Sequence, residues 1–368
     1  MNSIKRIWGV IWLLPFIIYI TGCASTRKSI PVQIQKPAEI TLPGIKILAV
    51  ADFGVGPEID SRVGSEVARK LRAKLVQNGY YNLIEDWRVK QALAEHGVEK
   101  IEQLDAQQYQ AIGKSLEVDG LLFGTVGIYF HQDAGGPRTT RKRVKEGDKS
   151  VTKTIKSYVM TRTANVQVTF RVVDAKTGLV LASLARTVEE KDTDAQPIQE
   201  TEVKNLFSLS ALKKAKQLLG KEVSDEEKAR NMAIENLMPA TVLFDQAIDK
   251  LAQQITETIA PYISDEKRIL EAGGHKLITS GYDLALLDLW DDAKEAWETV
   301  IEDEKTTKVH PKAWYNIGIY HELKGDLDEA DKCFSKAHKI KDDKLYLNAR
   351  GRIKARQKEL AKLEEQAM

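Results

Sequence analysis

The chain has 368 residues and a formal net charge of +2 at pH 7, with 55 Lys and Arg against 53 Asp and Glu. This balance excludes a global field that would attract nucleic acid or a membrane, so partners must be sought in local patterns. The length fits about two domains of ~150 residues. Only two cysteines are present, Cys23 and Cys333, which excludes a disulfide-rich scaffold.

The first 22 residues have the pattern of a signal peptide. Lys5 and Arg6 precede an apolar stretch over residues 7–20. As a helix this stretch reaches only ~21 Å, well short of a ~30 Å hydrocarbon core. We therefore expect residues 1–22 to be a leader and not a mature membrane span.

The end of this leader resembles the lipobox of bacterial lipoproteins, which here consists of Ile20, Thr21, Gly22 and Cys23. The resemblance implies cleavage after residue 22 and a covalent lipid on Cys23, whose two or three acyl chains would anchor the protein stably. Ala24 follows instead of Asp, which by the rules of that family favours the outer membrane. An ordinary secretory signal with a chance cysteine is the alternative.

Residues 23–44 are polar, are punctuated by prolines and lack a helical period. This composition predicts a flexible tether after the acylated cysteine. As a random coil of about 21 residues it would span only ~25 Å.

Residues 45–262 alternate between strand and helix patterns, which predicts an α+β fold with a sheet packed on helices. The hairpin is the clearest local signal, because Asp174 to Gly178 places a glycine where the turn requires positive φ. In chain order the predicted elements are a strand at 45–53, a helix from 63 that ends at Asn78-Gly79, a strand at 80–85, helices at 87–96 and 105–116, strands at 118–129, 166–173 and 179–187, and a helix at 241–262.

Three motifs of this domain resemble the CsgG family of curli-secretion lipoproteins, whose fold the related TolB amino-terminal domain shares. They are AVADF at 49–53, VDGLLFG at 118–124 and VVDAKTGLV at 172–180. The D-x-x-T-G turn in the third motif is the most specific. The resemblance implies a location on the periplasmic side of the outer membrane and a homo-oligomer, since the curli protein assembles into a secretion pore.

Two insertions interrupt this domain, at about 132–156 and 189–239. The curli pore depends on two long hairpins with tracts of alternating apolar and polar residues. The first insertion is charged on both alternating faces, and the second has helical periodicity over 206–219 and 225–238. We therefore expect a relative that kept the soluble domain and lost the pore.

The first insertion is strongly basic and forms a polar loop or an extended hairpin. It carries Arg138, Arg141, Lys142, Arg143 and Lys145. Such a run is either a solvated face or a contact surface for anionic groups on lipids or on a protein, and each basic residue near a charged membrane contributes ~1 kcal/mol. Nucleic acid is disfavoured, because the compartment is wrong and no aromatic residue interleaves before Tyr158.

The carboxy-terminal part resembles tetratricopeptide repeats, an all-α array of helix pairs. Trp314, Gly318, Ala330 and Phe334 carry the resemblance in residues 313–341, and an earlier copy repeats the pattern at an offset of 37. We predict two repeats over 270–341 and a capping helix over 342–368. The resemblance implies a protein partner on the concave face, where Asn316, Ile319 and Tyr320 bind it or merely pack.

No catalytic or metal motif stands out. The six histidines contain no H-x-H or H-x-x-x-H pair, and Cys333 falls on an apolar helical face typical of a structural thiol. We expect a non-catalytic, lipid-anchored scaffold or adaptor in outer-membrane assembly or secretion, with no cofactor besides the lipid. A CsgG-type secretion pore and a lipoprotein activator of a cell-wall synthase are the alternatives, and the short tether weighs against the activator.

Overall fold

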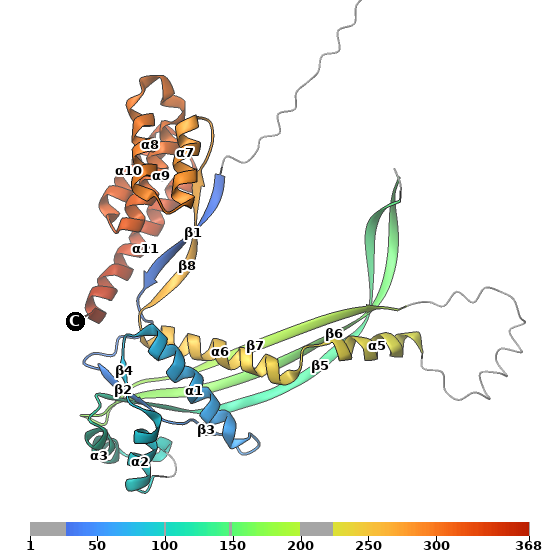
Figure 1. Cartoon of the computed structure of the whole chain (residues 1–368), viewed down its shortest axis with the longest axis vertical. Helices are drawn as coiled ribbons and strands as arrows, with labels where there is room; N and C mark the ends of the chain where they lie inside the picture. Colours follow the sequence, from blue (N-terminus) through green and yellow to red (C-terminus); the bar gives the residue numbers. More distant parts are fainter. Residues whose placement is uncertain (1–26, 99–100, 147–148, 199–223, 368) are drawn as a thin grey trace, which may run out of the picture. The chain divides into compact units, whose positions relative to one another are not determined.

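The computed structural model describes residues 27–98, 101–146, 149–198 and 224–367 (Figure 1). They form two compact units, which we describe separately. The helical unit comprises the described residues 27–34 and 263–361, and the sheet unit comprises residues 35–262 and the end of the chain from 362. The predicted lipobox, Ile20, Thr21, Gly22 and Cys23, and the predicted helix at 206–219 lie outside the described residues.

The sheet unit is built on a mixed sheet with the strand order β4-β2-β5-β6-β7, and β3 pairs with β5. Strand β2 pairs in parallel with β4 and β5, whereas β5, β6 and β7 are antiparallel. The elements are β2 (Ile47–Val50), β3 (Gly54–Val55), α1 (Ser61–Asn78), β4 (Asn82–Leu83), α2 (Asp86–Glu95), the 3-10 helix η1 (Ile101–Gln103), α3 (Ala106–Leu116), β5 (Gly120–Glu146), β6 (Lys149–Asp174), β7 (Val180–Pro197), α5 (Asp225–Asn236) and α6 (Ala240–Ile259).

Helices cover both faces of this sheet. Leu122 and Val172 point to a core formed with α1 and α6, while their neighbours Phe123 and Val173 point to a second core formed with α2 and α3. This alternation is the period of two that strands impose on their side chains. The predicted α+β fold, with its sheet packed on helices, is confirmed.

Local signals set several of the boundaries that the sequence predicts. Helix α1 ends at Gly79, which has φ +74° and so terminates the helix in the left-handed conformation. Helix α3 begins with a capping box in which Asp105 and Gln108 bond each other's backbone N–H groups. Gly178 has φ +73° in the turn between β6 and β7, as the hairpin motif requires.

The first insertion is the outer half of a long hairpin. Strands β5 and β6 pair from Gly120↔Asp174 to Glu146↔Lys149 with a one-residue register shift between Val126 and Ile128, so residues 132–156 are strand throughout apart from the undescribed tip at 147–148. Of the two forms that the sequence left open for this insertion, a polar loop or an extended hairpin, the structure has the hairpin. Strands pair through backbone groups, and such pairing tolerates polar side chains on both faces.

The second insertion differs from its predicted helical pattern at its start. Strand β7 continues to Pro197, which pairs with Ser157 of β6, whereas a polar insertion was predicted from residue 189. The predicted helix at 225–238 is confirmed as α5.

The helical unit contains a two-stranded sheet besides its helices. Its elements are β1 (Arg27–Lys36), β8 (Tyr262–Glu271), α7 (Lys276–Leu286), α8 (Trp290–Glu302), the 3-10 helix η2 (Glu304–Val309), α9 (His310–Lys324), α10 (Leu327–Ile340) and α11 (Lys344–Ala367). Arg27 contacts Glu271 and Gln33 contacts Asp265, so β1 and β8 run antiparallel. We call this strand pair the ribbon.

The predicted flexible tether over 23–44 is wrong for residues 27–36, which form β1. Ile30, Val32 and Ile34 alternate with exposed residues and are buried in the core of the helical unit. Burial of three branched side chains on one face is what fixes a strand in place. Pro31 is tolerated there because prolines occur on edge strands.

The helices pack as two successive hairpins, α7 with α8 and α9 with α10. Gly281 lies against the indole of Trp297, and Gly318 lies against the ring of Phe334. A Cβ atom at either glycine would come within 2.5 Å of these rings, so both positions require a residue without a side chain. A helical carboxy-terminal region is thereby confirmed, and its tetratricopeptide character stays a prediction.

Candidate peptide-binding site on the helical unit

The three residues predicted to contact a partner differ in how far their side chains are buried. Asn316 and Ile319 are fully buried, whereas Tyr320 is half-buried beside a cavity. The prediction that Asn316 and Ile319 present themselves to a partner protein is therefore wrong. The chain's own ribbon covers the helix face on which they lie.

Asn316 holds the ribbon by its backbone. Its Oδ1 accepts a hydrogen bond from the N–H of Glu271 at 2.9 Å, and its Nδ2 donates to the carbonyl of the same residue at 2.9 Å. One carboxamide thus satisfies both backbone groups of a buried strand residue, which would otherwise be costly to bury. This contact involves only the backbone of the strand residue and so does not depend on that residue's side chain.

Further groups of α9 bind β8 and the segment that follows it. The Tyr315 hydroxyl donates to the carbonyl of Ile269 at 3.0 Å, and Lys312 Nζ donates to the carbonyl of Gly273 at 3.0 Å. Burial raises the pKa of Tyr315 to about 12, so it remains a donor at physiological pH. The helical unit therefore holds an extended segment against α9.

Charged side chains fix the same contact. The Glu322 carboxylate is almost fully buried and accepts from Arg268 of β8 at 2.9 Å and from Arg352 of α11 at 2.6 Å. Two guanidinium partners compensate the buried negative charge, since an unpaired one would be very unfavourable. Glu322 thus joins the ribbon, α9 and α11.

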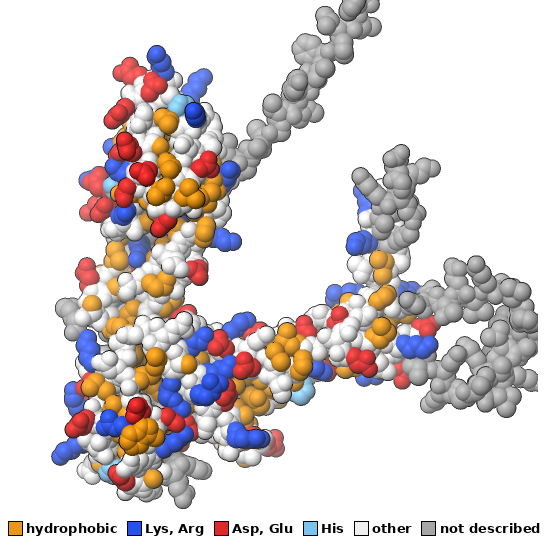
Figure 2. All heavy atoms as spheres, viewed as in Figure 1, with side chains coloured by type: hydrophobic (Ala, Val, Ile, Leu, Met, Phe, Trp, Pro, Cys, Tyr) orange, Lys and Arg blue, Asp and Glu red, His pale blue; other side chains and the backbone are white. Residues whose placement is uncertain are grey.

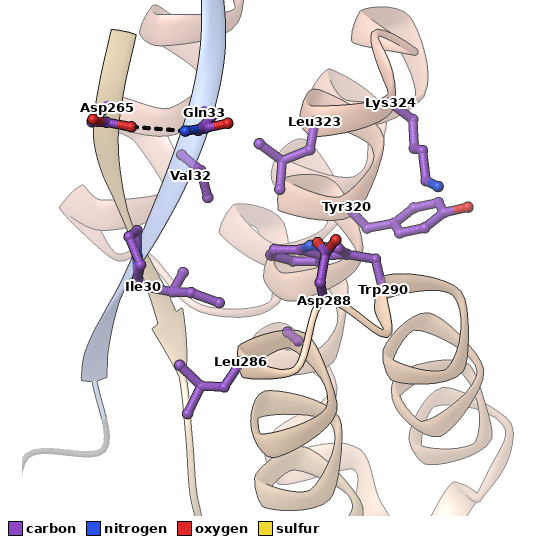
Figure 3. A pocket seen from close by; sticks show the side chains of 12 residues that line it. Ile30, Val32, Gln33, Asp265, Leu286, Asp288, Trp290, Tyr320, Leu323 and Lys324 are labelled. Atoms are coloured by element: carbon purple, nitrogen blue, oxygen red, sulfur yellow. Dashed lines mark hydrogen bonds between the residues drawn. The ribbon is translucent and has the colours of Figure 1, made fainter. Parts of the chain in front are cut away.

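Beside the ribbon lies an open cavity of about 540 Å³ (Figure 3). Its apolar lining comes from Ile30 and Val32 of β1, Ala285 and Leu286 of α7, Trp290 of α8 and Leu323 of α9. Its polar lining comes from Gln33, Asp265, Asp288, Tyr320 and Lys324. An apolar concavity with a few polar groups at its edge is typical of a ligand site. We call it the ribbon cavity.

Tyr320 is fixed in position at the edge of the ribbon cavity. Its hydroxyl donates to Asp291 Oδ1 at 2.6 Å, and this hydrogen bond raises the pKa of Tyr320 to about 12. The ammonium groups of Lys294 and Lys324 lie 5.8 and 5.5 Å from its ring centroid. A held aromatic ring is a suitable contact surface because little conformational freedom is lost when a ligand packs on it.

The corner between α7 and α8 is both apolar and acidic. Leu286, Leu287 and Leu289 are exposed, Leu287 by 71%. Residues 281–304 contain nine Asp and Glu but a single lysine, Lys294. Exposed large apolar side chains next to a cavity indicate an interaction surface, and the surrounding carboxylates favour a positively charged partner.

The sequence contains a signal for this surface that the sequence analysis did not use. More apolar residues than the inner face of a helix pair needs occur in the run Leu286-Leu287-Asp288-Leu289-Trp290. In the structure Asp288 has φ +62° and turns the chain, so these apolar side chains cannot all point inward.

Cys333 is buried in α10, as predicted from its apolar face. Burial raises the pKa of its thiol to about 11, which keeps it neutral at physiological pH. It contributes to packing.

A second cavity, of about 590 Å³, lies in the sheet unit beyond the end of β2. Its carboxylates are bound by other groups of the same unit. Burial raises the pKa of Asp52, but its hydrogen bond from Ser65 and the charges of Lys90 and Arg72 outweigh this and hold it below its usual range. Glu102 accepts from the N–H of Gly54 at 3.2 Å. These contacts stabilise the loop after β2.

Two features are absent from the part of the chain that the structure describes. No cluster of three or more His, Cys, Asp or Glu in this part is arranged to hold a metal ion. Within the same ranges, each helix is too short or too polar to cross a membrane.

The motif residues of the sheet unit come together in space. Asp119 accepts from the N–H groups of Lys46 and Ile47 at 3.0 and 2.9 Å and pairs with Lys176 at 2.7 Å. Asp174 accepts from the N–H groups of Lys176 and Thr177, which closes the turn. These motif residues therefore bind the β6–β7 turn to the start of β2, which is a structural role.

The basic residues of the first insertion lie on the outer part of the β5–β6 hairpin, where Figure 2 shows Lys and Arg side chains. The side chains of Arg138, Arg141, Lys142 and Arg143 are exposed. None of these four pairs with a carboxylate among the residues that the structure describes. Lys145 lies in β5, but its side chain is outside the described set.

Comparison with solved structures gives similarities of low identity. Lipoprotein GNA1162 from Neisseria meningitidis is 14% identical, with a TM-score of 0.27, over 47% of this chain and 93% of that chain. The LpoB C-terminal domain from Escherichia coli is 13% identical, with a TM-score of 0.25, over 40% and 88%. The PelC dodecamer from Paraburkholderia phytofirmans is 17% identical, with a TM-score of 0.23, over 44% and 83%.

Among curated proteins, no match is found. Two family models match the chain. Residues 280–363, which lie in the helical unit up to residue 361, match a domain of unknown function, DUF6340. Residues 48–268 match the model described as curli production assembly/transport component CsgG, which spans more than half of the chain. On the sheet order, the motif contacts and this match, the chain belongs to the CsgG family.

Proposed function

We propose that this protein is a non-catalytic adaptor of the bacterial envelope, anchored by a lipid on Cys23 to the periplasmic side of the outer membrane. Its helical unit would bind an extended segment of a protein partner in the ribbon cavity. The observation that carries the proposal is this cavity, because an apolar concavity lies between a strand and a fixed tyrosine, beside three exposed leucines.

The chemistry of the ribbon cavity specifies the partner segment. Ile30, Val32 and Trp290 favour a bulky apolar side chain, and Asp265 and Asp288 favour a neighbouring Lys or Arg. The way Asn316 holds Glu271 supports an extended conformation, since the same unit already binds one strand by its backbone. We therefore propose an extended basic and apolar segment as the ligand.

A photo-crosslinking amino acid at Leu286 tests the cavity in cells. We expect a defined crosslinked partner from Leu286 and none from Leu347, an exposed leucine of α11 that serves as the control. The crosslink should weaken in Asp288→Asn, which keeps a residue suited to positive φ but removes a charge, and persist in Asp342→Asn. Equal crosslinking from both leucines would contradict the proposal.

The anchor has its own test. Cys23→Ala should leave the chain unprocessed or release it from the membrane fraction, whereas metabolic labelling with a palmitate analogue should mark only the unaltered protein. Acylation that persists in Cys23→Ala would contradict the proposed anchor and leave the cavity proposal intact.

An oligomeric secretion component is a second candidate. Membership of the CsgG family and the long β5–β6 hairpin favour it. The exposed charges of Arg138, Arg141 and Lys142 on both faces of that hairpin disfavour insertion into lipid. Electron microscopy of detergent-extracted protein distinguishes the two, because ring-shaped particles are expected only for the secretion component.

A further inference from the structure

The outer part of the β5–β6 hairpin projects beyond the rest of its sheet. Strand β7 stops pairing at Pro197, opposite Ser157, while β5 and β6 remain paired to Glu146 and Lys149. Beyond the pair Arg138↔Ser157 the hairpin is therefore two-stranded. The described side chains on both of its faces are exposed, apart from half-buried Ser157 at the base.

The register sorts these side chains onto two unlike faces. Residues directly opposite each other share a face, and faces alternate along each strand. One face, which we call the cationic face, carries the pairs Thr139↔Lys156, Arg141↔Thr154 and Arg143↔Thr152. Every described side chain on it, that of Ser150 included, is basic or carries a hydroxyl group, with no carboxylate and no apolar side chain.

The opposite face is less uniform. It carries Arg138 beside Ser157, Thr140 beside Ile155, and Lys142. Ile155 is 39% exposed and lies between the two cations of this face. The two faces thus provide a comparison within one hairpin. Each face has two exposed cations on β5. On the cationic face the residues opposite these cations are Thr154 and Thr152, whereas on the other face Ile155 lies between the cations.

We propose that the cationic face binds the phosphate groups of anionic lipid headgroups. Arg141 and Arg143 would each donate two parallel hydrogen bonds to phosphate oxygens, a geometry that guanidinium groups favour. Thr152 and Thr154 stand directly opposite them and add hydroxyl donors to the same oxygens. The contact is peripheral, since the cations stay in the headgroup region and no charged residue enters hydrocarbon.

The geometry favours a lipid surface over an acidic protein segment. Arg141, Arg143 and the threonines opposite them place several donors on one face of the hairpin, which suits closely spaced phosphates. From Thr139↔Lys156 outward, no described side chain of this face is apolar, so a protein side chain has nothing to pack on there. The inference adds a second membrane contact to the proposed lipid anchor. It does not depend on that anchor, because it can be tested without acylation.

The test uses the chain from Ala24 to its end, which lacks the lipid. The vesicles are made of phosphatidylcholine with and without about 30% phosphatidylglycerol, a fraction that is enough for electrostatic attraction. We expect sedimentation only with the anionic vesicles and a decrease of binding with salt. Arg141→Gln with Arg143→Gln should weaken binding about thirtyfold, by about fivefold for each cation. Arg138→Gln with Lys142→Gln, the same loss of charge on the opposite face, should change it less than about threefold.

Three outcomes would overturn the proposal. One is the absence of binding to anionic vesicles at low salt, and another is an equal loss in the two double variants, which would indicate net charge alone. The third is retention on immobilised polyglutamate that is lost in Arg141→Gln with Arg143→Gln but not in Arg138→Gln with Lys142→Gln, together with no binding to vesicles. This result would assign the cationic face to an acidic protein. Unchanged circular dichroism spectra of both variants control for folding, and fractionation of Cys23→Ala tests the anchor independently.

Discussion

Asn316 shows how one side chain can convert a presumed binding surface into part of the core. Its position on an inner helix of a repeat-like pair suggested a partner contact. Both ends of its carboxamide are instead used on Glu271, within the same unit. The pattern of helical residues could not reveal this, because the strand that covers them is 45 residues away in sequence and carries no repeat signal.

We predict that Asn316→Ala lowers the free energy of unfolding of the helical unit by about 2 kcal/mol, because it leaves a buried N–H and a buried carbonyl without partners. Urea denaturation followed by tryptophan fluorescence measures this. Asn348→Ala, at an exposed position of α11 in the same unit, should change stability by less than about 0.5 kcal/mol. Equal effects of the two substitutions would show that the hydrogen bonds of Asn316 with Glu271 contribute nothing.

At the scale of elements, the sequence predicted those whose signals are local. Helix α1 ends at Gly79, α3 begins at Asp105, and the β6–β7 turn contains Gly178, all as expected. Such features depend on residues within one turn of the chain. The site was predictable only through Tyr320, because the other residues of the ribbon cavity come from three separate segments.

The ribbon escaped prediction for a physical reason. Strand β1 has only three inward apolar residues, separated by Pro31 and Gln33, and its partner β8 is polar through its middle, from Ser264 to Arg268. Neither segment is stable alone, since a strand pair needs a surface to cover. That surface is the helix pairs, which fold from residues more than two hundred positions later.

The strand assignment of β1 can be tested with a substitution at Ile34. Ile34 is buried, so Ile34→Ala should lower the free energy of unfolding by about 2 to 4 kcal/mol through lost burial and a residual cavity. An exposed residue of the same strand is the control, and Ser29→Ala should be nearly neutral. Thermal unfolding by circular dichroism measures both variants. A flexible tether would instead make both substitutions silent.

At the scale of the whole molecule, the described residues contain separate hydrophobic cores in the two units. Leu71 lies in a core of the sheet unit and Phe334 in the core of the helical unit. Cores without shared residues unfold independently unless a large interface couples them. We therefore expect calorimetry to resolve two transitions.

The two transitions should respond to different substitutions. Leu71→Ala should lower the midpoint of one transition and Phe334→Leu that of the other, each through a cavity in one core. The side chains of both residues are fully buried, so each variant is a matched control for the other. A single transition that both variants shift together would contradict independent unfolding.

The pairing of β1 with β8 also determines how mechanical force would enter the helical unit. Arg27 lies opposite Glu271, so the described amino-terminal end of β1 and the end of β8 that leads into the helices are at the same end of the ribbon. A pull on the chain before Arg27 would therefore open the ribbon from this end and load its interstrand hydrogen bonds one after another. The ion pair between Arg27 and Glu271 would be the first contact to break.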